Sequence, residues 1–127
     1  AMSLHATFPG ACPLVGARDC DLTVYMAVKK TPVTAQQCLT QAERGRAANA
    51  IGDDACKRHG LSVFPTAEDC LHQIELFPWI GQCVTAAQLA TSHGVYLETP
   101  AKLPSHLTWW PYEGVERHTL FVATEGV

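Results

Sequence analysis

Residues 105–113 gather the side chains in this sequence that are best suited to chemistry or ligand binding. The segment is typical of a strand, in which successive side chains point to opposite faces of the sheet. Trp109 therefore points to one face, while His106, Thr108 and Trp110 share the other. An imidazole, a hydroxyl and a large aromatic ring on one face are the groups that form ligand pockets and interface hot spots.

The sequence leaves two interpretations of that face open. If it is exposed, Trp110 stands beside His106 on an open surface and the face is a binding site. If a helix covers it, Trp110 is part of the hydrophobic core. The exposure of this one ring separates the two interpretations.

The same alternation places Tyr25 and Ser62 on the faces opposite the apolar sides of their own strands. If these strands are neighbours, then Tyr25, Ser62, His106 and Trp110 line one cleft. Glu113 follows the aromatic segment and is the nearest acid in the chain. The ligand-binding candidates are therefore Tyr25, Ser62, His106, Thr108, Trp110 and Glu113.

No standard nucleotide-binding, hydrolase or metalloprotease motif is present, so catalytic residues are left unassigned and no cofactor is predicted. Six cysteines could form three disulfides in an exported protein. The N-terminus shows no export signal, so free thiols are favoured. Cys56, His59, Cys70 and His72 have zinc-ligand chemistry, but two of them would leave a helix on opposite sides. No metal site is predicted.

Secondary structure follows from periodicity and capping residues. Residues 22–29 alternate like a strand with one buried side. Thr34 with Gln37 predicts a capping box that opens a helix along the apolar stripe from Ala35 to Ala42. The remaining expected elements are helix 54–59, strand 61–64, helix 66–77, and strands 83–89, 95–99, 105–110 and 119–123.

This order predicts an α+β fold: a single domain with helices in the first half, packed on a mostly antiparallel sheet. Residues 1–20 carry two prolines and two glycines and are interpreted as an irregular N-terminal lead-in. Residues 21–127 form the domain. The whole chain of 127 residues is long enough to bury a core without disulfides or metal.

Tyr25 and the run from Gly60 to Asp69 resemble, in layout, small ADP-ribosyltransferase-like domains across residues 22–123. The resemblance implies that Ser62 matches the hydroxyl of the family's middle strand and that Glu113 or Glu116 matches its late acid. The family's first strand usually offers Arg or His to the cofactor, and residues 24–27 carry neither. The resemblance implies a nucleotide-dependent transferase as one alternative.

Composition bounds the partners. The net charge is −3, and the sequence carries no basic stripe, so no nucleic-acid partner is expected. No apolar run approaches the ~20 residues of a membrane span. Charged residues make up 17% of the chain, and the charge-poor segment 84–112 is either buried or forms a homodimer face.

The leading expectation is a small cytoplasmic binding module for a small molecule or a protein partner, with Trp110 and His106 in its site. The alternatives are a nucleotide-dependent transferase that uses Ser62 with Glu113 or Glu116, and a structural subunit of an assembly.

Overall fold

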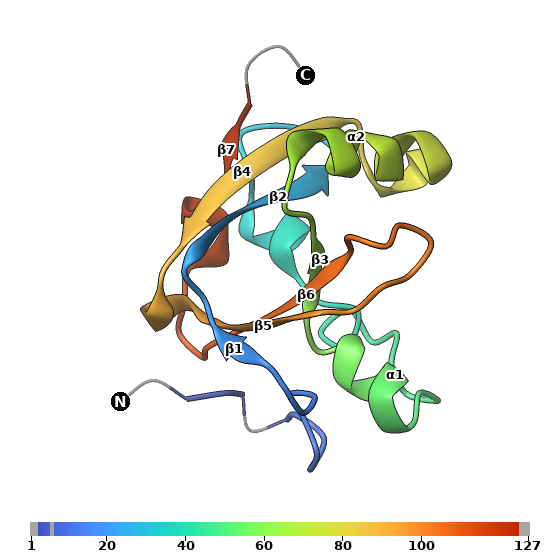
Figure 1. Cartoon of the computed structure of the whole chain (residues 1–127), viewed down its shortest axis with the longest axis vertical. Helices are drawn as coiled ribbons and strands as arrows, with labels where there is room; N and C mark the ends of the chain where they lie inside the picture. The colour runs from blue at the N-terminus through green and yellow to red at the C-terminus, as the bar shows by residue number, and fades with distance from the viewer. Residues whose placement is uncertain (1–2, 6, 125–127) are drawn as a thin grey trace.

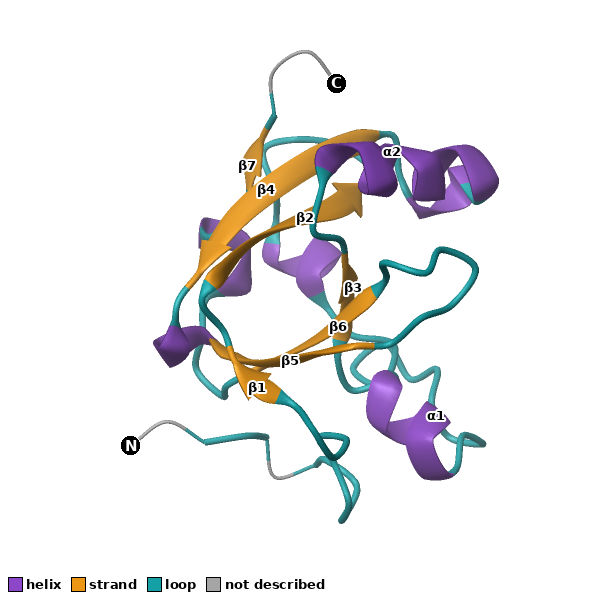
Figure 2. Cartoon of the chain, in the orientation of Figure 1, coloured by secondary structure: helices purple, strands orange, loops and turns teal. Residues whose placement is uncertain are grey.

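The computed structural model of the chain describes residues 3–5 and 7–124. Its strands form two sheets in which every pairing is antiparallel (Figures 1 and 2). The first sheet has the order β1-β5-β6-β3, with β1 at Arg18–Asp19, β5 at Gly94–Glu98, β6 at Leu107–Pro111 and β3 at Leu61–Val63. The second has the order β2-β4-β7, with β2 at Leu22–Val28, β4 at Cys83–Leu89 and β7 at Val122–Ala123.

Two α-helices accompany the sheets. α2 (Ala67–Leu76) lies against β2 and β4, whereas the short α1 (Gly52–Lys57) lies at the other end of the molecule (Figure 2). The α+β class and the antiparallel pairing are confirmed. The expectation that the helices occupy the first half is wrong, because the longer helix α2 lies in the second half and strands occur in both halves.

The main core lies between the two sheets. The alternating residues Val24, Met26 and Val28 of β2 are buried against the inner face of the first sheet, where Val63 and Trp109 are fully buried. The alternation expected for residues 22–29 is therefore confirmed, and its apolar side faces this core. Burial of such side chains is the dominant favourable term in folding.

A second core cluster lies on the opposite face of β2, beneath α2. Cys70 of α2 and Val84 of β4 pack there against Phe64. Thr66 caps α2 by accepting a hydrogen bond from the Asp69 amide at 3.1 Å, as its sequence predicts. This packing holds α2 beside the place where the two sheets meet.

The helix expected from Ala35 to Ala42 is wrong. Only Ala35–Cys38 is helical, as a 3-10 turn, and the Thr34 side chain makes no capping bond. The capping box forms instead between Thr40 and Glu43, whose side chains accept each other's amide protons at 3.1 and 2.8 Å. A threonine followed three residues later by glutamate matches this motif, and it encloses a turn here rather than opening a longer helix.

The cysteines differ from the expectation of six free thiols. Cys12 and Cys56 form a disulfide that joins the expected lead-in to α1. Residues 18–19 of that lead-in also form β1, which pairs with β5. Cys20, Cys38, Cys70 and Cys83 are free. The N-terminal segment is thus fastened to the domain.

The charge-poor segment 84–112 supplies most of β4 and all of β5 and β6, and many side chains of these strands are buried in the hydrophobic cores. Burial inside the chain accounts for its scarcity of charge, and the homodimer stays a prediction. Among residues 3–5 and 7–124, no helix is long and apolar enough to cross a membrane.

Candidate functional site

Ser62 occupies the middle of β3, the edge strand of the first sheet, and its side chain is exposed on the outer face. Two residues further on, Phe64 exchanges both main-chain hydrogen bonds with Tyr25 of β2, at 2.8 and 2.9 Å. Main-chain polar groups alternate between the two edges of a strand. The amide and carbonyl of Ser62 therefore point the same way as those of Phe64, away from β6.

The imidazole of His106 lies between Ser62 and the end of β5. Its Nε2 is 2.9 Å from the Ser62 hydroxyl oxygen. Its Nδ1 is 3.0 Å from the carbonyl oxygen of Thr99 and 2.9 Å from the Thr99 hydroxyl. The buried Thr99 and Thr108 hydroxyls are in turn 2.7 Å apart. Ser62, His106, Thr99 and Thr108 thus form one chain of hydrogen bonds, here named the Ser62–His106 cluster.

The Thr99 carbonyl favours one tautomer of this imidazole. A carbonyl oxygen can only accept, so we assign the proton to Nδ1 of His106, the tautomer that satisfies this carbonyl as well as the Thr99 hydroxyl. In the neutral ring Nε2 is then an acceptor, and the Ser62 hydroxyl donates to it. This is the polarity that a general base needs in order to remove a proton from serine.

The surroundings of His106 favour its neutral form. Burial lowers the pKa of the imidazole, and the ammonium group of Lys57 acts in the same direction. The hydrogen bond to Thr99 opposes this shift. The edge-to-face contact with Phe64, with ring centroids 5.5 Å apart, is part of the apolar wall that excludes water from the ring.

We expect the pH dependence of stability to follow from this lowered pKa. The unfolded chain protonates His106 more readily than the folded chain does, so the contribution is complete above the unfolded pKa of about 6.5 and is lost as pH falls below it. NMR titration of the ring resonance that disappears in His106→Gln measures the pKa of this imidazole in the folded chain. A midpoint at or above that of a histidine in an unstructured peptide would contradict the expectation.

The loop that precedes His106 is tied to α2. The Ser105 hydroxyl donates to the Asp69 carboxylate at 2.7 Å, and Asp69 lies in the capped first turn of α2. The contact fixes the chain just before His106 and so helps to set the direction of the imidazole.

Trp110 lies on the expected outer face but is not exposed. The ring is 0% exposed, and its Nε1 donates to the carbonyl of Cys56 in α1 at 2.9 Å. The interpretation of Trp110 as an open binding aromatic is therefore wrong, because α1 and Gly60 cover it. The alternative that a helix of the same chain covers the ring is confirmed.

Tyr25 and Glu113 are not part of the Ser62–His106 cluster. Tyr25 is half-buried and packs beneath α2 in the same cluster as Phe64. The Phe64 ring contacts the His106 imidazole, so Phe64 lies between Tyr25 and His106. Glu113 is exposed beyond the far end of β6, where its amide donates to the carbonyl of Ser3. Of the six sequence candidates, the structure brings together Ser62, His106 and Thr108.

Thr99 is the member of the cluster that the sequence did not indicate. It follows β5 and precedes Pro100, and its amide donates to the His106 carbonyl at 3.0 Å. Its role depends on the register of β5 against β6, in which Leu97 pairs with Thr108. A threonine before a proline carries no sequence signal that would reveal that pairing.

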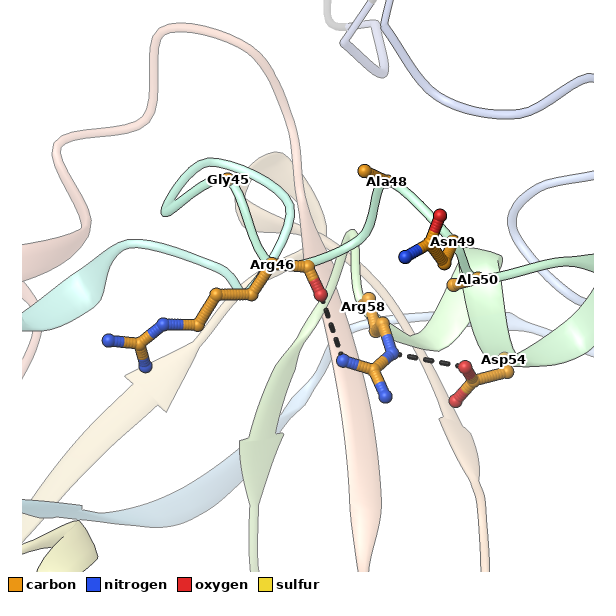
Figure 3. A pocket seen from close by; sticks show the side chains of 7 residues that line it. All are labelled: Gly45, Arg46, Ala48, Asn49, Ala50, Asp54 and Arg58. Atoms are coloured by element: carbon orange, nitrogen blue, oxygen red, sulfur yellow. Dashed lines mark hydrogen bonds and ion pairs between the residues drawn. The ribbon is translucent and has the colours of Figure 1, made fainter.

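Two cavities lie elsewhere on the molecule. One of about 310 Å³ is lined by Gly45, Arg46, residues 48–50, Asp54 and Arg58. Figure 3 shows the Arg58 guanidinium between the Arg46 carbonyl and the Asp54 carboxylate, with bonds of 2.9 and 3.0 Å, while the Arg46 side chain extends away from the other labelled residues. Arg58 is thus already paired within the chain.

The second cavity, of about 210 Å³, lies between the N-terminal segment and the ion pair of Arg117 with Glu43. Arg117 also donates to the Cys38 carbonyl and to Nε2 of His5. Burial tends to raise the pKa of Glu43, but hydrogen bonds from Arg117 and Thr40 outweigh it and lower the value to about 2. The pair is balanced in charge and ties the N-terminal segment to the body.

Comparison with protein-family models, with curated proteins and with solved structures finds no match. The resemblance to ADP-ribosyltransferase-like domains stays a prediction. Within residues 3–5 and 7–124, no group of three or more His, Cys, Asp or Glu side chains is placed to hold a metal ion. The fold and the cluster define an α+β chain in which a serine on the edge strand β3 is hydrogen-bonded to a histidine directly before the inner strand β6.

Proposed function

We propose that the chain is an acyl-transfer enzyme in which Ser62 is the nucleophile and His106 the general base. The observation that carries the proposal is the 2.9 Å contact between the Ser62 hydroxyl and Nε2 of His106, with Nδ1 held by Thr99. A nucleophile, a base within hydrogen-bond reach and a third group that orients the base are the parts that such catalysis requires.

In the proposed reaction, the Ser62 oxygen attacks the carbonyl carbon of the substrate and its proton passes to Nε2 of His106. The imidazolium then gives this proton to the departing oxygen or sulfur, which leaves an acyl group on Ser62. Water, deprotonated by the same nitrogen, releases the acid and restores the hydroxyl. The Ser62 amide, directed away from β6, is a main-chain donor available to the developing oxyanion.

The orienting group supports a particular substrate class. Thr99 offers His106 a carbonyl and a hydroxyl rather than a carboxylate, so it stabilises the imidazolium less than an aspartate would. Weak stabilisation of the imidazolium suits acyl groups whose leaving group needs little protonation. We therefore propose esters and thioesters, rather than amides, as substrates.

The expectation of a binding module rested on an exposed Trp110. Because that ring is 0% exposed, it cannot serve as the main contact for a ligand or partner. The transferase alternative required Ser62 to meet Glu113 or Glu116, and both acids lie beyond the opposite end of β6. The acyl-transfer proposal uses the side chains that do meet.

A fluorophosphonate probe, which labels activated serines, tests the proposal. We expect the purified chain to be labelled at Ser62, and Ser62→Ala to abolish the label. Ser92→Ala is the matched control, because Ser92 is an exposed serine in the 3-10 turn Thr91–His93, at the other end of β5 from Thr99 and His106. His106→Gln is expected to slow labelling by about 10²-fold or more.

Two results would overturn this function: a folded wild-type chain that is not labelled, or a label that survives in Ser62→Ala. Thr99→Val tests the positioning role of the Thr99 hydroxyl. It is expected to move the pH of half-maximal labelling, and Thr99→Ser is expected to restore it, which a purely structural role would not require.

A further inference from the structure

The outer face of the first sheet is covered by two short segments, residues 8–17 and residues 52–60, here named the lid. In Figure 1 the N-terminal segment and α1 lie at the bottom of the molecule, below β5 and β6 and away from α2. The disulfide between Cys12 and Cys56 joins the two halves of the lid across 44 residues of sequence. The lid is the part of the chain that covers Trp110.

Besides the disulfide, polar contacts at residue 58 fasten the second half of the lid: the Ala42 amide donates to the Arg58 carbonyl, and the Arg58 guanidinium donates to the Arg46 carbonyl, each at 2.9 Å. Trp110 donates to the Cys56 carbonyl at 2.9 Å, and Phe8 meets the His59 ring edge-on with centroids 5.4 Å apart. Val15 of the lid is 100% exposed, and Ile51, which directly precedes α1, is 84% exposed, so neither of these large side chains anchors the lid. α1 has six residues and no side-chain cap, which is too short for a helix to persist without tertiary support.

The lid also borders the Ser62–His106 cluster. Lys57, which follows Cys56 directly, is the charged group of the lid that acts on the His106 imidazole. Gly60 at the end of the lid packs closely against Thr108, because a Cβ at Gly60 would overlap the Thr108 methyl group. A change in the position of α1 therefore reaches the base and its hydroxyl neighbour.

We propose that the Cys12–Cys56 disulfide is a redox latch: its reduction by a dithiol releases the lid from Trp110 and displaces Lys57 from the neighbourhood of His106. The effect on the cluster rests on the function proposed above, whereas the release of the lid does not. A disulfide in a reducing compartment is usually a transient, redox-sensing one, so the latch is compatible with the cytoplasmic location predicted from the sequence.

The exchange is balanced. One thiolate of the dithiol attacks Sγ of the half-buried Cys12, the Cys12–Cys56 bond breaks, and the Cys56 sulfur leaves as a thiolate that takes a proton. The second thiol of the reductant then attacks its own sulfur in the mixed disulfide and releases the Cys12 thiol. The reductant ends as a cyclic disulfide, and two electrons have passed to the protein.

The buried free cysteines do not take part in this thiol–disulfide exchange. Burial raises the pKa of Cys20 and of Cys70 to about 12 and that of Cys38 to about 11, so these thiols do not form thiolates at neutral pH. Cys83 is the half-buried free thiol. Cys83→Ser is therefore the background in which reduction affects the latch alone.

Dithiothreitol treatment of the full chain, followed by limited proteolysis and tryptophan fluorescence, tests the latch. After reduction we expect an unchanged far-UV circular dichroism spectrum, with cleavage within residues 8–17 and 52–60 at least about tenfold faster. Emission is expected to shift to the red, and the shift is expected to vanish in Trp110→Phe. The double variant Cys12→Ser/Cys56→Ser is expected to behave like the reduced chain, and Cys83→Ser like the wild type.

Two outcomes would overturn the latch. If reduction unfolds the whole chain in one transition, the disulfide is a structural staple. If cleavage and emission do not change, the lid stays seated without it. Fluorophosphonate labelling of the oxidised and reduced forms separates the two proposals: absence of labelling in both rejects the catalytic role, while proteolysis still reports on the lid.

Discussion

Trp110→Ala is expected to destabilise the protein by about 3–5 kcal/mol. The ring is fully buried between β6 and α1, so its removal leaves a large cavity and also removes one of the hydrogen bonds that the Cys56 carbonyl accepts. Urea unfolding followed by circular dichroism measures the loss, and the slope with denaturant shows whether the transition remains two-state.

Two variants separate the causes. Trp79→Ala removes a ring of the same kind that is 70% exposed, and it is expected to change stability by less than about 0.5 kcal/mol. Trp110→Phe keeps most of the buried volume but removes the bond to Cys56, and we expect a loss of about 1–3 kcal/mol. Equal effects of Trp110→Ala and Trp79→Ala would show that the lid does not cover Trp110 in solution.

The burial of Trp110 shows how far strand parity reaches. Parity placed Trp109 and Trp110 on opposite faces, and the structure has them there. It could not reveal that both faces are covered, because the cover is made of an irregular lead-in and a six-residue helix with no apolar stripe. The link between them, Cys12 to Cys56, is one of many pairings that six cysteines allow, and connectivity does not follow from sequence.

The cluster was predictable in part for the same reason. His106 lies directly before β6 and shares a face with Thr108 through the alternation of the extended segment. Ser62 joins them because β3 pairs with β6 so that Ser62 faces Thr108. That pairing is a long-range contact, which sequence periodicity does not specify. The position of Thr99 in the cluster depends on a further pairing, between β5 and β6. The choice of Glu113 came from the resemblance in layout, and the structure does not bring this acid to Ser62.

The register of β5 against β6 is set at the opposite end from the cluster, by Gly94. A Cβ at this position would overlap the Trp110 carbonyl, and it would lie 2.9 Å from the Pro111 Cα and 3.0 Å from Nε1 of Trp109. Its φ of +136° is a conformation that side chains rarely adopt. Because most of these neighbours are main-chain atoms, they cannot move aside without shifting β6.

Gly94→Ala is therefore expected to cost about 4 kcal/mol or more, or to prevent folding, as measured by urea unfolding. Gly114→Ala is the matched control, since Gly114 also has a positive φ, of +88°, but a Cβ there would meet nothing within 4 Å beyond its chain neighbours. That variant is expected to lose only about 1 kcal/mol from backbone strain. Equal losses would mean that strain at glycine, rather than the close approach of β5 to β6, governs stability here. A much larger loss of stability in Gly94→Ala would show that the close approach of Gly94 to β6 sets the β5–β6 register, on which the positions of Thr99 and His106 depend.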